Sequence, residues 1–343
     1  MSRARSALPL ALAAAVAWAS LALGGCDDPA KNAPRAPATP VAPAPSAEAP
    51  APSAKAPASL TVQTDDWSIK RPAPSRVVAI GDLHGDIERT KRVLRLAGAV
   101  DANINWSGGA LVVVQTGDQV DRGDGDREII DLIERLRREA RAAGGDFIAT
   151  LGNHELMNAQ LDFRYVTKGA ALSFDEFAAE APDGAKGLLG MRGRAGAFAP
   201  GHAYAKKLAE QPLLAWVGDS VFVHGGILPK HLGIGLHNMD RETREWLRGE
   251  RPEAPRAVMA EDGPVWTRLY SAAPGPRECK MLESVLDALG AKRMVVGHTV
   301  QAGGITEACG GKVRRIDCGL SAFYGGPIQA LEIQGDDVKV LKE

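Results

Sequence analysis

The sequence predicts an α/β domain in which short buried strands alternate with helices. Five short runs of apolar or β-branched residues are each followed by a cluster of polar residues, and two segments between the early runs have the periodicity of amphipathic helices. About 280 residues follow position 60, which is enough for one large domain with its own hydrophobic core. We therefore expect a single α/β domain over residues 60–343.

The five apolar runs are predicted to be buried strands. Each is rich in Val, Ile, Leu or Ala, and each ends where a polar motif begins. They cover residues 76–80, 110–116, 146–151, 220–223 and 292–296. After Gln334 a final pair of strands is expected.

Two segments between the early strands are predicted to be helices. They cover residues 87–96 and 128–141. Asp86 and Asp126 lie just before them, where a carboxylate oxygen can accept a hydrogen bond from a free backbone amide of the first turn. Strand, polar loop and helix should therefore repeat in that order along the chain.

Residues 157–211 interrupt this alternation with an Ala- and Gly-rich, mainly helical insertion. The insertion contains Arg164, Phe174 and Phe177. Two interpretations stay open at this point. The insertion is either a lid or side wall of a functional site, or a structural excursion that does not contact a substrate.

The first 25 residues have the pattern of a secretory signal peptide. Arg3 and Arg5 precede a mostly apolar stretch over residues 7–23, and small residues then lead to Cys26. This order matches the bacterial lipobox, in which the cysteine is lipidated and becomes the mature N-terminus. The alternative is an uncleaved membrane anchor, because the stretch is only slightly shorter than the roughly 20 residues that span a bilayer. We expect a lipoprotein of the cell envelope, anchored to a membrane surface and facing the periplasm or the exterior.

Residues 26–59 are predicted to be a tether. They are dominated by Ala, Pro and Ser and contain nine of the 22 prolines of the chain. Such a composition cannot bury enough apolar surface to form a core. It favours extended segments that rise about 3.1 Å per residue, so the tether could reach up to about 90 Å.

Charge and cysteine content exclude some classes of protein. The formal net charge of −1 argues against a nucleic-acid partner, which usually requires a basic face. Cys279, Cys309 and Cys318 lack the paired C-x-x-C spacing of zinc or redox sites, and three cysteines allow one disulfide at most. A Cys309–Cys318 pair across a hairpin is one option among the pairings. The cysteine–arginine phosphate loop of tyrosine phosphatases with a cysteine nucleophile is not present.

Five short motifs carry the residues with chemistry. In chain order they are GDLHGD from Gly81, GDQVDRG from Gly117, GNHE from Gly152, HGG from His224 and GHT from Gly297. Each places Asp, His or Asn directly after a predicted strand, so that oxygen and imidazole ligands gather where strands end. The sequence therefore predicts a metal centre at the edge of a sheet.

These motifs resemble those of the PPP class of phosphatases within the calcineurin-like metallophosphoesterase superfamily. A single Gly-Asp-x-His is a weak signal, but five motifs in the order of that family are specific, and the resemblance covers residues 77–326. It implies an α/β fold of the family type, a four-layer αββα sandwich with a helical insertion. It also implies a hydrolase that removes phosphate from phosphomonoesters.

The resemblance further implies that six side chains hold two divalent cations, drawn from Mn, Fe and Zn. The first cation would be bound by Asp82 and His84, the second by Asn153, His224 and His298, and both by Asp118. A mixed set of oxygen and nitrogen ligands suits these metals. A shared carboxylate is needed because two such cations lie about 3.5–4 Å apart and repel each other. The pair would lower the pKa of a bridging water and present hydroxide to phosphorus at neutral pH.

Four further residues are assigned to catalysis. Arg122 and Arg268 are predicted to bind phosphoryl oxygens, since a guanidinium can contact two such oxygens at once. By the resemblance, His154 would donate a proton to the leaving oxygen and Asp121 would orient its ring. The alternative for Arg122 is a surface ion pair.

The remaining polar residues near the motifs receive no catalytic role. Among the acidic residues these are Glu155, Asp86 and Asp317. Three histidines outside the motifs are taken as structural: His202, His231 and His237. Tyr324 either lines the cleft or belongs to the core.

One position separates subgroups of the family. Gln119 stands where eukaryotic serine/threonine phosphatases of this class usually have tyrosine. With the insertion and the GHTVQ segment from Gly297, the pattern is most similar to the Shewanella-like protein phosphatases, a group associated with phosphotyrosine. A phosphoprotein, with phosphotyrosine favoured, is therefore the first substrate expected.

Two alternative functions stay open. One is a nucleotide-directed hydrolase, such as a diadenosine tetraphosphatase or a phosphodiesterase, because related folds use the same metal centre. The other is a catalytically degenerate, surface-tethered binding domain. The second alternative is disfavoured, because every expected ligand, the acid and its orienting carboxylate are present together.

Overall fold

The computed structural model describes residues 70–185, 187 and 190–343. The predicted signal peptide over residues 1–25, the tether over residues 26–59 and Cys26 lie outside the described residues. Within the described ranges, no helix combines the length and the apolar character that crossing a bilayer requires.

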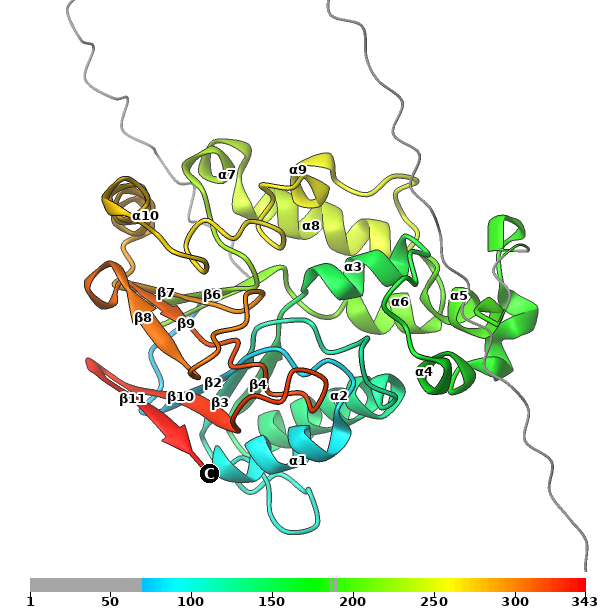
Figure 1. Cartoon of the computed structure of the whole chain (residues 1–343), viewed down its shortest axis with the longest axis horizontal. Coiled ribbons are helices and arrows are strands. Elements are labelled where there is room, and N and C mark those ends of the chain that lie inside the picture. Colours follow the sequence, from blue (N-terminus) through cyan, green and yellow to red (C-terminus); the bar gives the residue numbers. More distant parts are fainter. Residues whose placement is uncertain (1–69, 186, 188–189) are drawn as a thin grey trace, which may run out of the picture. The chain divides into compact units, whose positions relative to one another are not determined.

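Two β-sheets pack face to face, with helices on both outer sides (Figure 1). The first sheet consists of β11 (Asp337–Lys342), β10 (Gln329–Gln334), β2 (Val77–Ile80), β3 (Val112–Gln115) and β4 (Asp146–Ala149), in that order. The second consists of β1 (Lys70–Arg71), β5 (Leu214–Val217), β6 (Ser220–Val223), β7 (Arg293–Val296), β9 (Val313–Arg315) and β8 (Thr306–Ala308). The predicted four-layer αββα architecture is confirmed.

The outer layers are formed by separate groups of helices. α1 (Ile87–Leu96) and α2 (Asp126–Ala142) cover the first sheet, and α10 (Pro276–Leu289) covers the second (Figure 1). Three more helices continue the layer above the second sheet, namely α7 (Pro229–Ile234), α8 (Leu236–Leu247) and α9 (Arg256–Met259).

The central strands β2, β5, β6 and β7 are buried on both faces, which explains their mostly apolar sequences. In β2, Val77 and Ala79 pack into the core between the sheets, whereas Val78 and Ile80 pack against the helical side. The residues of β6 alternate in the same way, with Phe222 facing the other sheet. A strand that lies between a sheet and a helix layer must be apolar at every position.

Strand direction brings the polar motifs together. β2, β3 and β4 are parallel to one another, and β6 is parallel to β7. Their carboxyl ends therefore lie at a common edge of each sheet, where the motif loops begin. The fold thus places five loops from distant parts of the sequence around one site.

The insertion forms a helical group of its own. α3 (Asn153–Ala159) begins in the third motif and leads into it. The insertion contains α4 (Lys168–Leu172), η1 (Asp175–Glu180), η2 (Asp183–Ala185), α5 (Arg192–Phe198) and α6 (Ala203–Leu208) (Figure 1). Phe174 lies at its centre, with ring centroids 5.1 Å from Phe198 and 4.8 Å from Tyr204. Phe177 packs against the same cluster. These two phenylalanines therefore stabilise the insertion rather than the functional site.

Of three local predictions, the helix cap at Asp86 is confirmed, and the other two were wrong in detail. Asp86 caps α1 as expected, because its carboxylate accepts a hydrogen bond from the Arg89 amide at 3.0 Å. Asp126 is not a cap: α2 begins at this residue, and the carboxylate accepts a hydrogen bond from the Asp121 amide at 3.0 Å instead. The final strand pair starts before Gln334, which is the last residue of β10.

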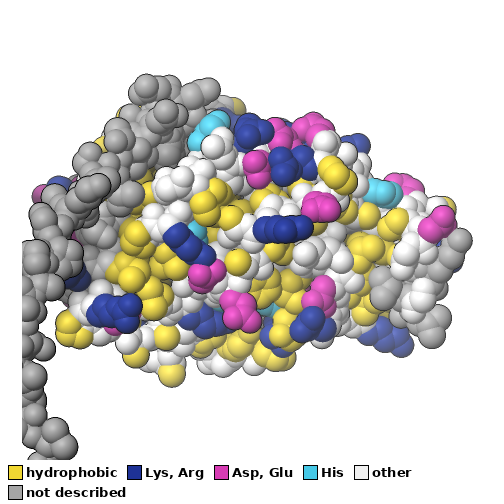
Figure 2. Space-filling model, turned by 90° about the horizontal axis from the view of Figure 1, so that it is seen from above, with side chains coloured by type: hydrophobic (Ala, Val, Ile, Leu, Met, Phe, Trp, Pro, Cys, Tyr) yellow, Lys and Arg dark blue, Asp and Glu magenta, His cyan; other side chains and the backbone are white. Residues whose placement is uncertain are grey.

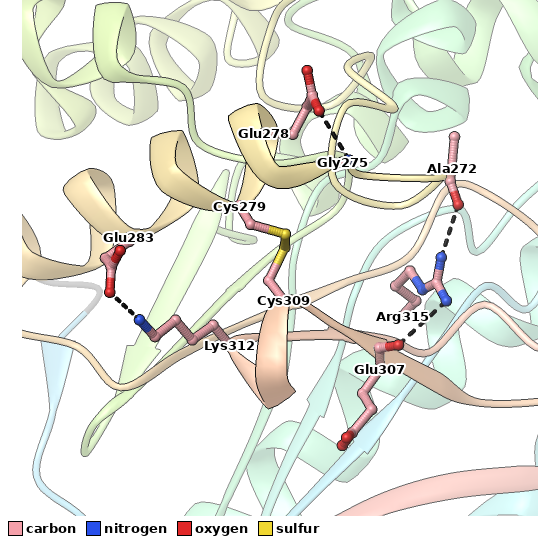
Figure 3. Close-up of a disulfide and its surroundings, with 9 residues drawn as sticks. All are labelled: Ala272, Gly275, Glu278, Cys279, Glu283, Glu307, Cys309, Lys312 and Arg315. Carbon is pink, nitrogen blue, oxygen red and sulfur yellow. Dashed lines mark hydrogen bonds and ion pairs between the residues drawn. A yellow bond between two sulfur atoms is a disulfide. The ribbon is translucent and has the colours of Figure 1, made fainter.

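A disulfide joins Cys279 of α10 to Cys309 beside β8 (Figure 3). Cys318 is a free, buried thiol, so the Cys309–Cys318 option is wrong. Around the disulfide, Arg315 donates a hydrogen bond to the Ala272 carbonyl at 2.8 Å.

On the face seen in Figure 2, acidic and basic side chains are interspersed, which agrees with the formal net charge of −1.

Candidate metal centre

Six predicted ligands converge at the carboxyl ends of strands from both sheets. They follow β2, β3, β4, β6 and β7, and none of their side chains is more than 7 % exposed. They are Asp82, His84, Asp118, Asn153, His224 and His298. Burial of this many polar groups needs compensation by partners or by an ion.

Unusual backbone conformations aim three of these side chains. His84, Asp118 and His298 have φ values of 45°, 55° and 65°, in the left-handed region that non-glycine residues rarely adopt. A Cβ atom at Gly297 would lie 2.4 Å from an oxygen of Asp82, so only glycine permits this approach. Such strain is typical of functional sites.

Each of the three candidate ligand histidines donates one ring N–H to a backbone carbonyl. Nδ1 of His84 contacts the Val120 oxygen at 3.3 Å, and Nδ1 of His224 contacts the Thr116 oxygen at 2.8 Å. Nε2 of His298 contacts the Trp266 oxygen at 2.9 Å. A carbonyl can only accept, so the other ring nitrogen keeps a free lone pair that faces the site.

Four of these acceptor atoms crowd around one point. Nε2 of His224 lies 3.1 Å from Nδ1 of His298, 3.0 Å from Oδ1 of Asn153 and 3.2 Å from Oδ2 of Asp118. With neutral histidines, no proton lies between these lone pairs, so they repel one another. A divalent cation would remove the repulsion, and this mixed N/O set suits one.

A second group of ligand atoms shares Asp118 with the first. Nε2 of His84 lies 3.8 Å from Oδ2 of Asp118 and 3.9 Å from Oδ2 of Asp82. Nε2 of His154 also lies 3.8 Å from Oδ2 of Asp118. The described residues thus contain two groups that could each hold an ion, and Asp118 belongs to both.

The electrostatics of the cluster also fit a cation. Burial lowers the pKa of His84 to about 4, and burial together with His224 lowers the pKa of His298 to about 2, so both rings are neutral near pH 7 as metal ligands must be. Burial, with the nearby carboxylates of Asp317 and Asp118, raises the pKa of Asp82 well above its usual range. Added positive charge would relieve this carboxylate repulsion.

His154 differs from the other histidines in its partner. Its Nδ1 contacts Oδ2 of Asp121 at 2.6 Å, a carboxylate instead of a carbonyl. Burial opposes the charged ring, but Asp118 and this hydrogen bond outweigh it and raise the pKa of His154 to about 9. His154 therefore carries a proton near pH 7, as a general acid requires.

A cavity of about 210 Å³ opens onto these groups. Its lining includes Arg122 and Arg268, as predicted for a phosphate site. The Arg122 guanidinium lies 3.9 Å from the Tyr165 ring centroid, and its buried Nε has no hydrogen-bond partner among the described residues. Arg268 is exposed, and its Nη1 donates to the His298 carbonyl and, at 2.9 Å, to Thr299 Oγ1.

The insertion forms a wall of this cavity. Asp162, Arg164 and Tyr165 all line it, which favours the side-wall interpretation over a structural excursion. Tyr324 lines the cavity as well and is 37 % exposed, which excludes the core alternative for this residue.

Two residues assigned no chemistry in the sequence support the loops. Glu155 accepts hydrogen bonds from the amides of Gly152, Asp118 and Gln119 at 2.7 to 2.9 Å, and so fixes two motif loops against each other. Gln119, which replaces the usual tyrosine, exchanges two side-chain hydrogen bonds with Gln211 at 2.7 and 3.0 Å. This pair joins the second motif to the end of the insertion.

Sequence reasoning missed Arg194 and Tyr165. Arg194 is fully buried and forms an ion pair with Asp121, yet no motif surrounds it in the sequence. No motif in the sequence marks Tyr165 either. The one available signal for Arg194 was a charged residue within an Ala- and Gly-rich helix, which is expected to be buried on most sides.

Residues 75–302 match the family model of the calcineurin-like phosphoesterases. The chain is 37% identical to Shewanella-like protein phosphatase 2 of Arabidopsis thaliana over 77% of its own length and 76% of the relative. It is 29% identical to Shewanella-like protein phosphatase 1 of Plasmodium berghei (strain Anka), over 78% and 74% of the two chains. Its fold is similar to that of a cold-active protein tyrosine phosphatase, with a TM-score of 0.67 at 21% identity over 83% and 84% of the chains.

Proposed function

This chain belongs to the calcineurin-like phosphoesterase family and is a phosphatase, and we propose that it hydrolyses phosphomonoesters of proteins, with phosphotyrosine preferred. The observation that carries the proposal is the pair of buried ligand groups that share Asp118 at the base of the cavity. The identity to protein phosphatases over most of the chain supports phosphoproteins as the substrate class.

The proposed site holds two divalent cations. One would be held by Asp82 and His84, the other by Asn153, His224 and His298, with Asp118 common to both. When bound, such cations lower the pKa of a water molecule so that it can attack phosphorus, and they offset charge on the phosphoryl oxygens. This chemistry needs no covalent phosphoenzyme.

The protein side chains then act on the phosphate and the leaving group. Arg122 presents a guanidinium at the cavity wall that can donate to phosphoryl oxygens, and Arg268 is the second candidate clamp. His154 donates its Nε2 proton to the leaving oxygen as the P–O bond breaks, so that a neutral alcohol or phenol departs. Asp121 holds Nδ1 of the ring throughout.

The preference for phosphotyrosine rests on the walls of the cavity. Tyr165 and Tyr324 line it, and Phe323, which is 58 % exposed, packs 4.9 Å from the Tyr324 ring centroid. Aromatic rings of this kind favour offset or edge contacts with a second ring. A phenyl ring on the phosphate would find such partners, whereas a serine side chain would not.

Substrate profiling of the intact chain with added Mn²⁺ tests this proposal. A phosphotyrosine peptide should be turned over faster than a phosphoserine peptide of the same sequence, and both faster than diadenosine tetraphosphate. Faster turnover of the dinucleotide would replace the proposal with a nucleotide-directed hydrolase. Absence of turnover in a sample that binds metal would favour the degenerate binding domain.

The location proposed is the cell envelope, with a lipid anchor at Cys26. The lipobox pattern supports it, and so does the Cys279–Cys309 disulfide, because structural disulfides persist mainly in oxidising compartments. Mass spectrometry of the mature N-terminus is the test. A chain that starts at an unmodified Met1 would refute the anchor.

A further inference from the structure

We propose that Arg194, a residue of the insertion, is a positioning residue for proton transfer: it holds the Asp121 carboxylate in the orientation that aims His154 at the leaving group. This inference rests on the proposed role of His154 as the acid. It assigns to the insertion a second task beyond that of a cavity wall.

Arg194 extends from α5 towards Asp121 and is fully buried. Its Nη2 lies 3.1 Å from Oδ1 of Asp121 and 2.6 Å from Oδ2 of Asp126. Its Nε donates to Oδ1 of Asn158 at 2.7 Å. One guanidinium thus fixes three side chains, which a shorter or single-headed donor could not do.

These contacts assign a separate role to each oxygen of Asp121. Oδ1 accepts from Arg194 and from Nδ2 of Asn158, at 3.1 and 3.0 Å. Oδ2 is thereby left for Nδ1 of His154 at 2.6 Å. Nδ2 of Asn158 also donates to the His154 carbonyl at 2.9 Å, so the amide is fixed at both ends. Rotation of the Asp121 carboxylate would break its contacts with Arg194, Asn158 and His154 together.

The charge balance of this cluster depends on Arg194. The carboxylates of Asp121 and Asp126 are both fully buried, and Arg194 pairs with both of them, whereas His154 contacts Asp121 alone. Without it, two desolvated carboxylates would face each other, which is costly unless they move or take up a proton. A shift or protonation of the Asp121 carboxylate would release the ring of His154.

The alternative is that Arg194 only stabilises the insertion. Another ion pair between the insertion and the body of the protein provides a control for this alternative. Arg127 of α2 binds Glu176 of the insertion at 2.9 Å and donates to the Ser173 carbonyl at 2.6 Å. This pair also joins the insertion to the body of the protein, but it does not touch Asp121. Loss of Glu176 therefore reproduces the loosening of the insertion without the loss of positioning.

Leaving groups of different basicity provide the readout. As the P–O bond breaks, the Nε2–H bond of His154 breaks and an O–H bond forms on the leaving oxygen. Phenolate needs this proton, whereas dinitrophenolate departs without it. The ratio of kcat for phenyl phosphate to kcat for dinitrophenyl phosphate therefore measures acid catalysis. The ratio does not depend on the fraction of the sample that is folded.

The experiment compares four variants of the intact chain, loaded with Mn²⁺, with the wild type. Arg194→Lys and Arg194→Met should lower the kcat ratio about 10- to 100-fold, a part of the roughly 10²–10⁴ that a general acid contributes. The metal content should be unchanged. Glu176→Gln should leave the ratio unchanged, and His154→Ala should lower it the most.

Each other outcome has a defined meaning. If His154→Ala leaves the ratio unchanged, the acid assignment in the proposed function is wrong. If His154→Ala lowers it but Arg194→Lys does not, or if Glu176→Gln lowers it equally, only the positioning role is overturned. Should Arg194→Met not fold, Arg194→Lys still decides the question, because it keeps the charge and loses the planar fork.

Discussion

Two sides of the active site hold their histidines with different partners. On the metal side, formed by the six candidate ligands, each histidine donates to a backbone carbonyl. On the acid side, formed by His154, Asp121, Asn158, Asp126 and Arg194, the histidine contacts a carboxylate. A carbonyl fixes the tautomer without stabilising a charge, whereas a carboxylate favours the protonated ring. The partner therefore decides whether a histidine offers a lone pair or a proton.

The two sides also have different structural supports. The metal side lies on loops that directly follow strands of the two sheets, so its geometry is set by the sheet edges. The acid side depends on the helical insertion, which provides Arg194 and the carbonyl of Tyr165 that accepts from the Arg122 amide at 3.1 Å. Variants on the two sides should therefore fail in different ways.

The largest expected effect is the loss of Asp118, the proposed shared ligand. Asp118→Asn should abolish metal binding and turnover together, because one neutral amide cannot bind two cations. Loss of a residue that only hydrogen-bonds to a metal ligand already lowers metal affinity or activity about 10- to 100-fold. Elemental analysis and phosphatase assays measure the two quantities. Glu128→Gln, at an exposed residue of α2, is the control. Normal metal content in Asp118→Asn would contradict its place in the centre.

Loss of the acid should separate chemistry from metal binding. His154→Ala should keep the metals and slow hydrolysis of poor leaving groups by roughly 10²–10⁴. In the wild type, turnover of such substrates should fall as the pH rises through the pKa of His154, because only the protonated ring donates and Asp118 and the hydrogen bond to Asp121 raise the pKa of this ring. The pH profile of kcat measures this limb. An empty metal site in His154→Ala would instead make His154 a ligand.

This difference between the sides also explains what the sequence could predict. Asp82, His84 and Asp118 follow strands directly, and a parallel sheet brings the ends of its strands together, so pattern and position suffice. Arg194 lies 73 residues beyond Asp121, and its contact depends on how α5 packs. No local pattern records that packing.

The fold shows the same limit. The five strands that precede the motifs (β2, β3, β4, β6 and β7) and α1 were predictable from apolar runs and periodicity, whereas β1, β5, β8 and β9 were not predicted. Asp126 was misjudged as a cap, since the same carboxylate that suits a helix start also suits a buried ion pair with Arg194. The pairing of Cys279 with Cys309 was not predictable, because it depends on how α10 lies against the second sheet.

The disulfide tests whether stability and catalysis can be separated. A Cys279→Ala/Cys309→Ala variant should lose about 3–4 kcal/mol of unfolding free energy, as expected for a closed loop of roughly 30 residues. The kcat ratio between phenyl and dinitrophenyl phosphate should not change, because the bridge does not contact the acid side. Denaturant titration and the two assays measure these quantities. A changed ratio would show that the second sheet also positions the acid.

A structural histidine gives a further contrast with His154. His231 is buried, accepts from the Leu228 amide at 3.0 Å and donates to the Asp262 carbonyl at 2.9 Å. Burial lowers its pKa to about 4, so the unfolded chain binds a proton below pH 6.5 that the folded chain does not. The contribution of neutral His231 to the free energy of unfolding is therefore fully present above pH 6.5. It is lost as the pH falls to 4, which lowers the free energy of unfolding by about 3 kcal/mol.

His231→Gln should remove that pH dependence. The slope of unfolding free energy against pH between 4 and 6.5 should decrease by about one proton in the variant, whatever its absolute stability. Denaturant titrations at several pH values measure the slope. The phosphatase pH profile above pH 8 should be unchanged, because it belongs to His154. An unchanged stability slope would place the buried titration elsewhere.

The smallest expected effect concerns the wall that Tyr165 forms. Tyr165→Leu removes the ring that lies 3.9 Å from the Arg122 guanidinium but keeps the backbone carbonyl that accepts from the Arg122 amide. A contact of this kind is worth about 0.5–1 kcal/mol at exposed sites, so KM should rise roughly two- to fivefold. Tyr165→Phe keeps the ring and should behave like the wild type. The rise should be larger for a phosphotyrosine peptide than for a phosphoserine peptide, since only the former offers a second ring to the wall. If Tyr165→Leu lowered the kcat ratio of the two aryl phosphates instead, Tyr165 would belong to the acid side. The insertion would then position the proton donor through Tyr165 as well as through Arg194.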